Sequence, residues 1–179
     1  MEDEQKYETP KELLDFIFIE CSEMNYTSNE IRTINIENSK NFFFERIVFA
    51  IHLLKEQFNI NINELNIKRT QNVQIPDGLL ETLSLTSFGC INTDLRVLPT
   101  LPPTLKYLNI PRNRLTSLPK LPEGLLRLSC GSNSLVELPE IPSSLNVLWC
   151  NDNKLTSLPE LPHGIELISD IKNINSARN

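Results

Sequence analysis

The residues of this chain that are best suited to catalysis or metal binding do not assemble a recognisable site. The four cysteines are Cys21, Cys90, Cys130 and Cys150. No two of them have the CxxC spacing that zinc and redox sites commonly use. His52 and His163 have no Ser or Cys placed to act with them in nucleophilic catalysis. The five glycines form no phosphate-binding loop. The sequence therefore predicts no enzyme, no metal site and no cofactor.

Two pairs of residues could lie close enough to form a reactive site, but both are better explained as structural. Cys130 and Cys150 occupy the same inward position in successive copies of an internal repeat that builds a parallel sheet, so we expect their α-carbons to lie ~4.8 Å apart. No further ligand accompanies them, and cysteine also serves as a small core residue. Asp152 and Asp170 fall on neighbouring strands but not at equivalent positions, so they do not form a catalytic carboxylate pair.

Recognition of a protein surface is the chemistry that the residue types favour. Trp, Tyr and Arg dominate binding hot spots. We predict a partner-binding patch made of five residues, which are Tyr107, Arg112, Arg127, Val147 and Trp149. The alternative is that Trp149, the single tryptophan, packs sideways on Arg127 as incidental surface cover.

The direction of these side chains follows from an internal repeat. Three segments, at 105–124, 125–144 and 145–164, share the frame LxxLx(I/C)xxNxLxxLPx(L/I)Pxx, and a truncated copy fills 165–179. A period of about 20 residues is typical of a solenoid. Each LxxLx(I/C) predicts a short strand in a parallel sheet, with Leu108, Leu128, Leu148 and Ile168 in one inward column.

The remaining repeat positions have physical roles as well. The third, fifth, seventh and eighth positions face solvent on the concave side. The Asn of each copy can bond backbone groups of adjacent turns; these residues are Asn113, Asn133, Asn153 and Asn173. The paired prolines forbid a regular helix on the return limb, so we expect a thin convex side.

Upstream the pattern is less regular. We expect Leu80-x-x-Leu83-x-Leu85 to open a copy of 25 residues, with Thr82, Ser84, Thr86 and Ser87 facing solvent and a bulge or loop near Gly89 and Cys90. Copies also begin at Ile62 and Ile31, with a helix over 42–58 between them. Thr9, Pro10 and Glu12 form a capping box that predicts an N-terminal helix, which would cap the first strand.

Charge divides the chain into two regions. Residues 1–61 hold 12 of the 23 acidic and 6 of the 17 basic side chains, so 62–179 holds 11 of each. We therefore predict an acidic helical cap at 1–61 and neutral repeats at 62–179. Without a basic stripe, nucleic acid and anionic membranes are not expected partners. No apolar run is long enough to span a bilayer, and no signal peptide is evident. We therefore expect a cytoplasmic monomer with reduced thiols.

The motifs LPKLPEGL, LPEIPSSL and LPELPHGI resemble the LPX-type repeats of bacterial effectors of the IpaH and YopM kind. The resemblance covers 95–170 strongly and 62–94 weakly. It implies a leucine-rich-repeat solenoid of α/β class with a short parallel concave sheet, and an effector or scaffold in the host cytosol. The ligase activity of some members resides in a separate domain, so no residue here inherits it. Bacterial and viral origins both fit the composition.

Two functions stay open at this point. The chain is either an interaction module that holds a partner on its concave sheet, or a substrate receptor that docks on a ubiquitin-ligase-type complex through residues 1–61. Burial of Phe42, Phe43 and Phe44 favours the first, and an exposed apolar patch there favours the second. The interaction module is the preferred prediction.

Overall fold

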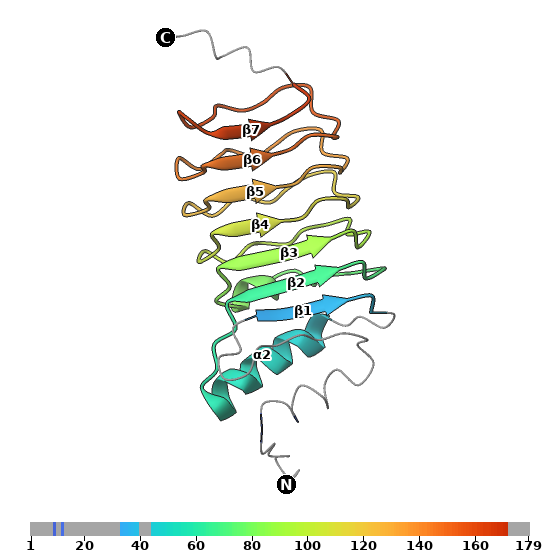
Figure 1. Cartoon of the computed structure of the whole chain (residues 1–179), viewed down its shortest axis with the longest axis vertical. Coiled ribbons are helices and arrows are strands. Elements are labelled where there is room, and N and C mark those ends of the chain that lie inside the picture. Colours follow the sequence, from blue (N-terminus) through green and yellow to red (C-terminus); the bar gives the residue numbers. More distant parts are fainter. Residues whose placement is uncertain (1–8, 10–11, 13–32, 40–43, 172–179) are drawn as a thin grey trace.

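Seven short strands stack in chain order into one parallel sheet (Figure 1). The computed structural model describes Thr9, Glu12 and residues 33–39 and 44–171. Its strands are β1 (Thr33–Glu37), β2 (Glu64–Lys68), β3 (Ser87–Ile91), β4 (Tyr107–Asn109), β5 (Arg127–Ser129), β6 (Val147–Trp149) and β7 (Glu166–Ile168). The predicted leucine-rich-repeat solenoid is confirmed, and the irregular copies stack continuously onto the regular ones.

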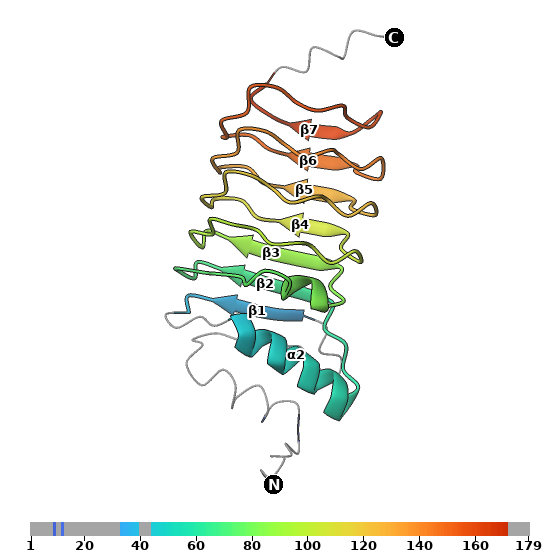
Figure 2. The ribbon, with the colours of Figure 1, turned by 180° about the vertical axis from the view of Figure 1, so that it is seen from behind.

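One α-helix, α2 (Phe44–Phe58), lies beside β1 at the N-terminal end of the described sheet (Figure 2). The helix predicted over 42–58 is thereby confirmed for residues 44–58, and the first two positions lie outside the described residues. Its buried face is apolar and consists of Phe44, Ile47, Val48, Ala50, Ile51 and Leu54. The helix ends where Asn59 takes a left-handed φ of 54°, a conformation that Asn tolerates. Ile60 then donates its amide hydrogen back to the carbonyl of Leu54 at 3.0 Å.

The predicted N-terminal helix lies largely outside the described residues. Its two described members agree with the capping box, because the Glu12 amide donates to Thr9 Oγ1 at 3.2 Å. Whether this segment caps the first strand stays a prediction.

Alternating residues of the strands build the core. The first inward column is Ile34, Leu65, Phe88, Leu108, Leu128, Leu148 and Leu167, and all except Leu167 are buried. The second inward column includes Ile67, Cys90, Ile110, Cys130 and Cys150, all at most 1% exposed. Successive repeats therefore bury one another's apolar side chains, which a single repeat could not do alone.

Each inward Asn ties neighbouring repeats together. Asn133, for example, donates through Nδ2 to the carbonyls of Ile110 and Cys130 at 3.0 Å each. Its Oδ1 accepts from the amide of Leu115 at 3.1 Å. Asn153 makes equivalent bonds one repeat further along. The predicted role of these asparagines is confirmed for 113, 133 and 153, whereas Asn173 lies outside the described residues.

Hydroxyl residues replace Asn at this position in the earlier repeats. Ser39, Thr70 and Thr93 are all buried there. The Ser39 amide donates to Thr70 Oγ1 at 3.4 Å, and the Thr93 hydroxyl donates to Asn113 Oδ1 at 2.9 Å. The ladder of polar groups is thus continuous although its residue type changes.

The Pro-rich return limb contains no helix between 92 and 164, as predicted (Figure 1). Instead, each limb ends in a tight turn that closes on a proline carbonyl. The amides of Leu105, Leu125 and Leu145 donate to Pro102, Pro122 and Pro142 at 3.1, 3.0 and 3.0 Å. A backbone of this kind leads into the next strand without the bulk of a helix.

The prediction that a 25-residue copy opens at Leu80 is wrong. The structure places a 3-10 turn at Leu80–Thr82 and the strand at Ser87–Ile91, where a loop was expected. Phe88 and Cys90 point inward and are 0% exposed, so the copy opens at Leu85 and has the regular length. Thr82 and Ser84 therefore lie outside the sheet, whereas Ser87 is an outward residue of β3, as predicted. The repeat frame is not apparent in the sequence here, because Phe88 replaces the leucine and Thr93 replaces the asparagine.

The predicted register of the last strand is also wrong. Leu148 pairs with Leu167 and Trp149 pairs with Ile168, so the spacing here is 19 residues (167 minus 148). A slip of one residue exchanges the two faces of a strand. Ile168 is therefore not in the inward column, and it is 47% exposed. The turn before β7 contains Gly164 at φ 76°, where the chain takes up the missing residue.

Candidate functional site

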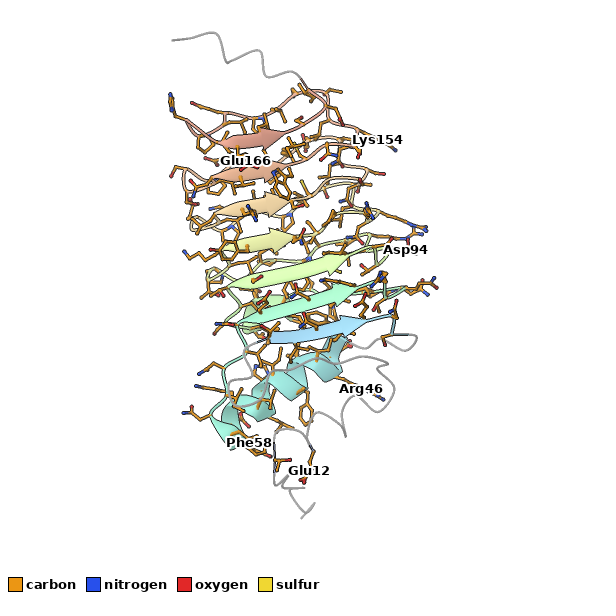
Figure 3. The ribbon with its side chains drawn as sticks, viewed as in Figure 1. Glu12, Arg46, Phe58, Asp94, Lys154 and Glu166 are labelled. Carbon is orange, nitrogen blue, oxygen red and sulfur yellow. The ribbon has the colours of Figure 1, made fainter. Side chains whose placement is uncertain are left out.

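The open face of the sheet carries two rows of outward side chains. The first row is Thr33, Glu64, Ser87, Tyr107, Arg127, Val147 and Glu166, and the second is Asn35, Asn66, Gly89, Asn109, Ser129, Trp149 and Ile168. Side chains project from every strand, with Glu166 at the last (Figure 3). Both rows are polar over β1–β3, whereas aromatic and aliphatic residues gather over β4–β7.

Trp149 is the centre of the apolar half. The guanidinium carbon of Arg127 lies 5.1 Å from the centroid of its ring, within cation–π range. Its Nε1 donates to Glu166 Oε1 on the next strand at 3.2 Å. The indole is therefore held on two sides and stays half-buried on the open face. The contact with Arg127 is the one that the surface-cover interpretation predicts, and it also fixes the orientation of the ring on the open face.

Tyr107, Arg127 and Val147 lie side by side in the first row, on three consecutive strands. Tyr107 is 48% exposed, a large value for an aromatic side chain held in a sheet. Arg112 lies apart from this row, in the exposed turn after β4, with a left-handed φ of 57°. The structure therefore brings four of the five predicted residues together directly, and Arg112 joins them at the rim.

Two depressions flank Trp149. The larger, of about 460 Å³, includes Tyr107, Arg127 and Trp149 among its lining residues. The smaller, of about 330 Å³, is lined by Trp149, Arg112, Ile168 and neighbouring small residues. Gly131 lies in the wall of the smaller one, where a side chain would meet Asn151. Trp149 thus stands as a ridge between two hollows, an arrangement that can receive side chains of a partner.

Ile168 belongs to this surface, although the sequence frame placed it inward. It is the cross-strand neighbour of Trp149 in the second row. Two signals in the sequence indicate the true register: Leu167 continues the leucine column, and Ser169 then takes the small-residue position of Cys150.

The charged groups around this patch differ in their hydrogen bonding. Glu166 accepts from the indole, and Asp152 Oδ2 accepts from Ser132 Oγ at 3.2 Å and from Asn151 Nδ2 at 2.9 Å. Among the described residues, by contrast, the guanidinium groups of Arg112 and Arg127 form neither a hydrogen bond nor an ion pair. The carboxylates are satisfied within the protein, and the guanidiniums are not.

The buried thiols are unsuited to chemistry. Burial raises the pKa of Cys90 to about 12, although a contact with the Thr93 hydroxyl opposes the shift. Burial likewise raises the pKa of Cys130 and Cys150, and the neighbouring thiol of Cys150 contributes to the shift of Cys130. A neutral buried thiol is a poor nucleophile and metal ligand. Cys130 and Cys150 both lie inward in successive repeats, as predicted.

The part of the chain that the structure describes contains no cluster of three or more His, Cys, Asp or Glu side chains arranged to hold a metal ion. In the same part, no helix combines the length and the apolar character needed to cross a bilayer.

Phe44 bears on the choice between the two predicted functions. It is 1% exposed under the sheet, as the interaction-module prediction requires of it. Phe42 and Phe43 lie outside the described residues, so an apolar docking patch within 1–61 is neither supported nor contradicted by them.

Comparison with known proteins finds similarity among solved structures. No protein-family model and no curated protein sequence matches the chain. Among solved structures, YopM from Yersinia enterocolitica WA-314 is similar, with 25% sequence identity and a TM-score of 0.49. The match covers 62% of this chain and 28% of the other, so this chain spans well under half the length of that protein.

Proposed function

We propose that the chain is a protein-interaction module that binds a partner protein on the open face of its sheet, as an effector or intracellular scaffold and not as an enzyme. One observation carries the proposal. Tyr107, Trp149 and Ile168 place aromatic and aliphatic surface on a face whose other half is polar. An exposed apolar patch rimmed by polar residues is typical of an interaction site.

The rigidity of the patch supports this proposal. Backbone pairing fixes the strands, and Trp149 is oriented by Arg127 on one side and Glu166 on the other. A side chain that is already ordered loses little conformational entropy when a partner covers it, so more of the contact energy appears as affinity. Arrays of this type commonly bind along the extended surface that their stacking creates.

The experiment is affinity capture from cells with three forms of the protein. The test form is Tyr107→Ala/Trp149→Ala, and the control is Val97→Ala/Val136→Ala. The control valines are 72% and 55% exposed, and they line neither depression of the open face. Each form is first shown to unfold at the same urea concentration as the wild type.

The expected result is a partner retained by the wild type and the valine control but lost from the aromatic variant. The purified partner should then bind the aromatic variant at least ~100-fold more weakly, because hot-spot truncations cost about 2 kcal/mol or more each. Equal retention by all three forms would contradict a site on the open face.

A further inference from the structure

We propose that the segment recognised on this surface is an extended, acidic stretch of polypeptide in which an Asp or Glu is separated by one residue from an apolar residue. This inference rests on the proposed function and specifies the chemistry of the partner. In it, the apolar side chain enters the smaller depression beside Trp149, and a carboxylate two residues away on the same face of the segment is held by Arg112.

The shape of the smaller depression supports an apolar side chain as its occupant. At about 330 Å³, it is open enough for one branched aliphatic side chain. Its apolar lining comes from four strands or the turns after them and consists of Ile91, Pro111, Trp149 and Ile168. Gly131 keeps one side free of a side chain. A pocket with apolar walls and a few polar groups at its edge is the usual form of a specific subsite.

The sign of the partner's charge follows from the hydrogen bonds around the pocket. Arg112 lines this depression, and Arg127 lines the larger one on the other side of Trp149. Within the described residues neither guanidinium has an acceptor, although each carries five N–H donors. The nearby carboxylates of Asp152 and Glu166 already accept from donors of the protein. The unsatisfied capacity of the surface is therefore for acceptors with negative charge.

An extended conformation of the segment fits the spacing of these groups. Arg127 and Arg112 flank the indole from opposite depressions, so carboxylates two residues before and two residues after the apolar residue, on the same face of the segment, can each meet one guanidinium. Alternate residues of an extended chain are separated by about 6 to 7 Å, and they can straddle a ridge the width of one ring. A guanidinium binds a carboxylate through two parallel hydrogen bonds, which fixes the register of the segment as well as its charge.

Single-stranded nucleic acid is the other class of ligand that combines negative charge with aromatic stacking. The repeat region argues against it, because residues 62–179 carry 11 acidic and 11 basic side chains and therefore no net positive charge to attract phosphates. A protein segment with two or three carboxylates needs only the two arginines beside Trp149.

The test is selection from a displayed library of random linear 12-residue peptides against the wild-type protein. We expect enrichment of sequences in which a Leu, Ile, Val or Phe has an Asp or Glu two residues before or after it. Synthetic versions of the enriched peptides are then titrated by isothermal titration calorimetry, which measures affinity in the same way for the wild type and for variants that lack Trp149, the single tryptophan of the chain.

Matched variants assign the result to Arg112. Arg112→Glu should weaken binding of the enriched peptides about tenfold or more, since a charge-assisted pair becomes a repulsive one. Arg96→Glu makes the same change of net charge at an exposed residue of the lateral edge, away from the open face, and should leave the affinity unchanged. Arg112 already occupies a left-handed conformation, so its replacement by another non-glycine residue adds no backbone strain.

The other outcomes are distinguishable. Enriched peptides that lose affinity for Trp149→Ala but not for Arg112→Glu would overturn the acidic-segment inference and leave the proposed function standing. Peptides that bind Tyr107→Ala/Trp149→Ala as well as the wild type would contradict both. Enrichment of basic or uncharged sequences, absence of any enrichment, or displacement of the peptides by a dT20 oligonucleotide would each overturn the inference.

Discussion

The substitution Asn113→Ala should be among the most destabilising single changes in the chain, because one side chain satisfies buried groups of two repeats. Its Oδ1 accepts from the amides of Thr93 and Leu95 at 3.0 and 3.2 Å. Its Nδ2 donates to the carbonyl of Cys90 at 2.7 Å and to that of Ile110 at 3.1 Å. Asn113 itself is 9% exposed, so little water is available to replace these bonds.

The size of the effect follows from the number of groups left without a partner. Alanine would leave two amides and the Cys90 carbonyl unpaired, and each buried unsatisfied group costs about 1–3 kcal/mol. Partial hydration of the enlarged space lowers the sum, so we expect a loss of about 3–5 kcal/mol in the free energy of unfolding. That is a large fraction of the ~5–15 kcal/mol that holds a typical domain together.

Equilibrium unfolding in urea measures this loss, followed both by circular dichroism and by the fluorescence of Trp149. Coincident transitions are needed, because stacked repeats can unfold in parts. The control is Asn109→Ala, which removes the same amide from the open face, where Asn109 is exposed. The control should change the stability by no more than about 0.5 kcal/mol.

A third variant separates hydrogen bonding from packing. Asn113→Thr reproduces the residue that occupies the same position in the two preceding repeats, Thr70 and Thr93. One hydroxyl can satisfy some of the backbone groups, so this variant should be about 1–2 kcal/mol more stable than Asn113→Ala. If Asn113→Ala lost no more stability than Asn109→Ala, the inference that these asparagines hold the turns together would be wrong.

Two further predictions concern the core and the open face. Burial raises the pKa of the core thiols, so as the pH rises these thiols ionise in the unfolded chain before they ionise in the folded protein. The free energy of unfolding should therefore be unaffected below about pH 8.5, where a free thiol begins to ionise, and should decline steadily above it. Urea midpoints between pH 7 and 10.5 measure this decline. A midpoint that stayed constant over this range would contradict the burial of the thiols. The substitution Gly89→Ala should cost about 1 kcal/mol, because a Cβ there would come within 2.3 Å of Asn66 Oδ1 and displace the side chain from its bonds to Asn35 and Glu64. Thermal unfolding measures this loss, and an unchanged melting temperature would mean that Asn66 is held by neither bond.

The regular repeats were predictable because each position of their frame has one physical role. A leucine every third or fourth residue, a buried Asn and two prolines leave a strand, a turn and an extended limb as the consistent solution. The structure shows all three in the copies that begin at Leu105, Leu125 and Leu145. Outward placement of Tyr107 and Trp149 followed from the same frame.

The errors arose where a residue of different type kept the same role. In the copy that opens at Leu85, Phe88 fills the leucine position and Thr93 fills the asparagine position. Leu80 and Leu83 match the leucine spacing of the repeat frame, but they belong to a short turn and its exit. Physical equivalence of a buried aromatic to a leucine, and of a hydroxyl to an amide, is not visible in a pattern of letters.

The register of the last strand was not predictable from periodicity, because it depends on the length of a turn. With the regular spacing of 20 residues, Ser169 would lie beside Trp149 and Leu167 beside Val147. The shortened turn at Gly164 instead brings Ile168 beside the indole and Glu166 beside Val147. Ile168 in the wall of the smaller depression and Glu166 as the acceptor of the indole N–H both follow from that shift. The candidate site therefore depends on the length of one turn as well as on the outward residues that the repeat frame specifies.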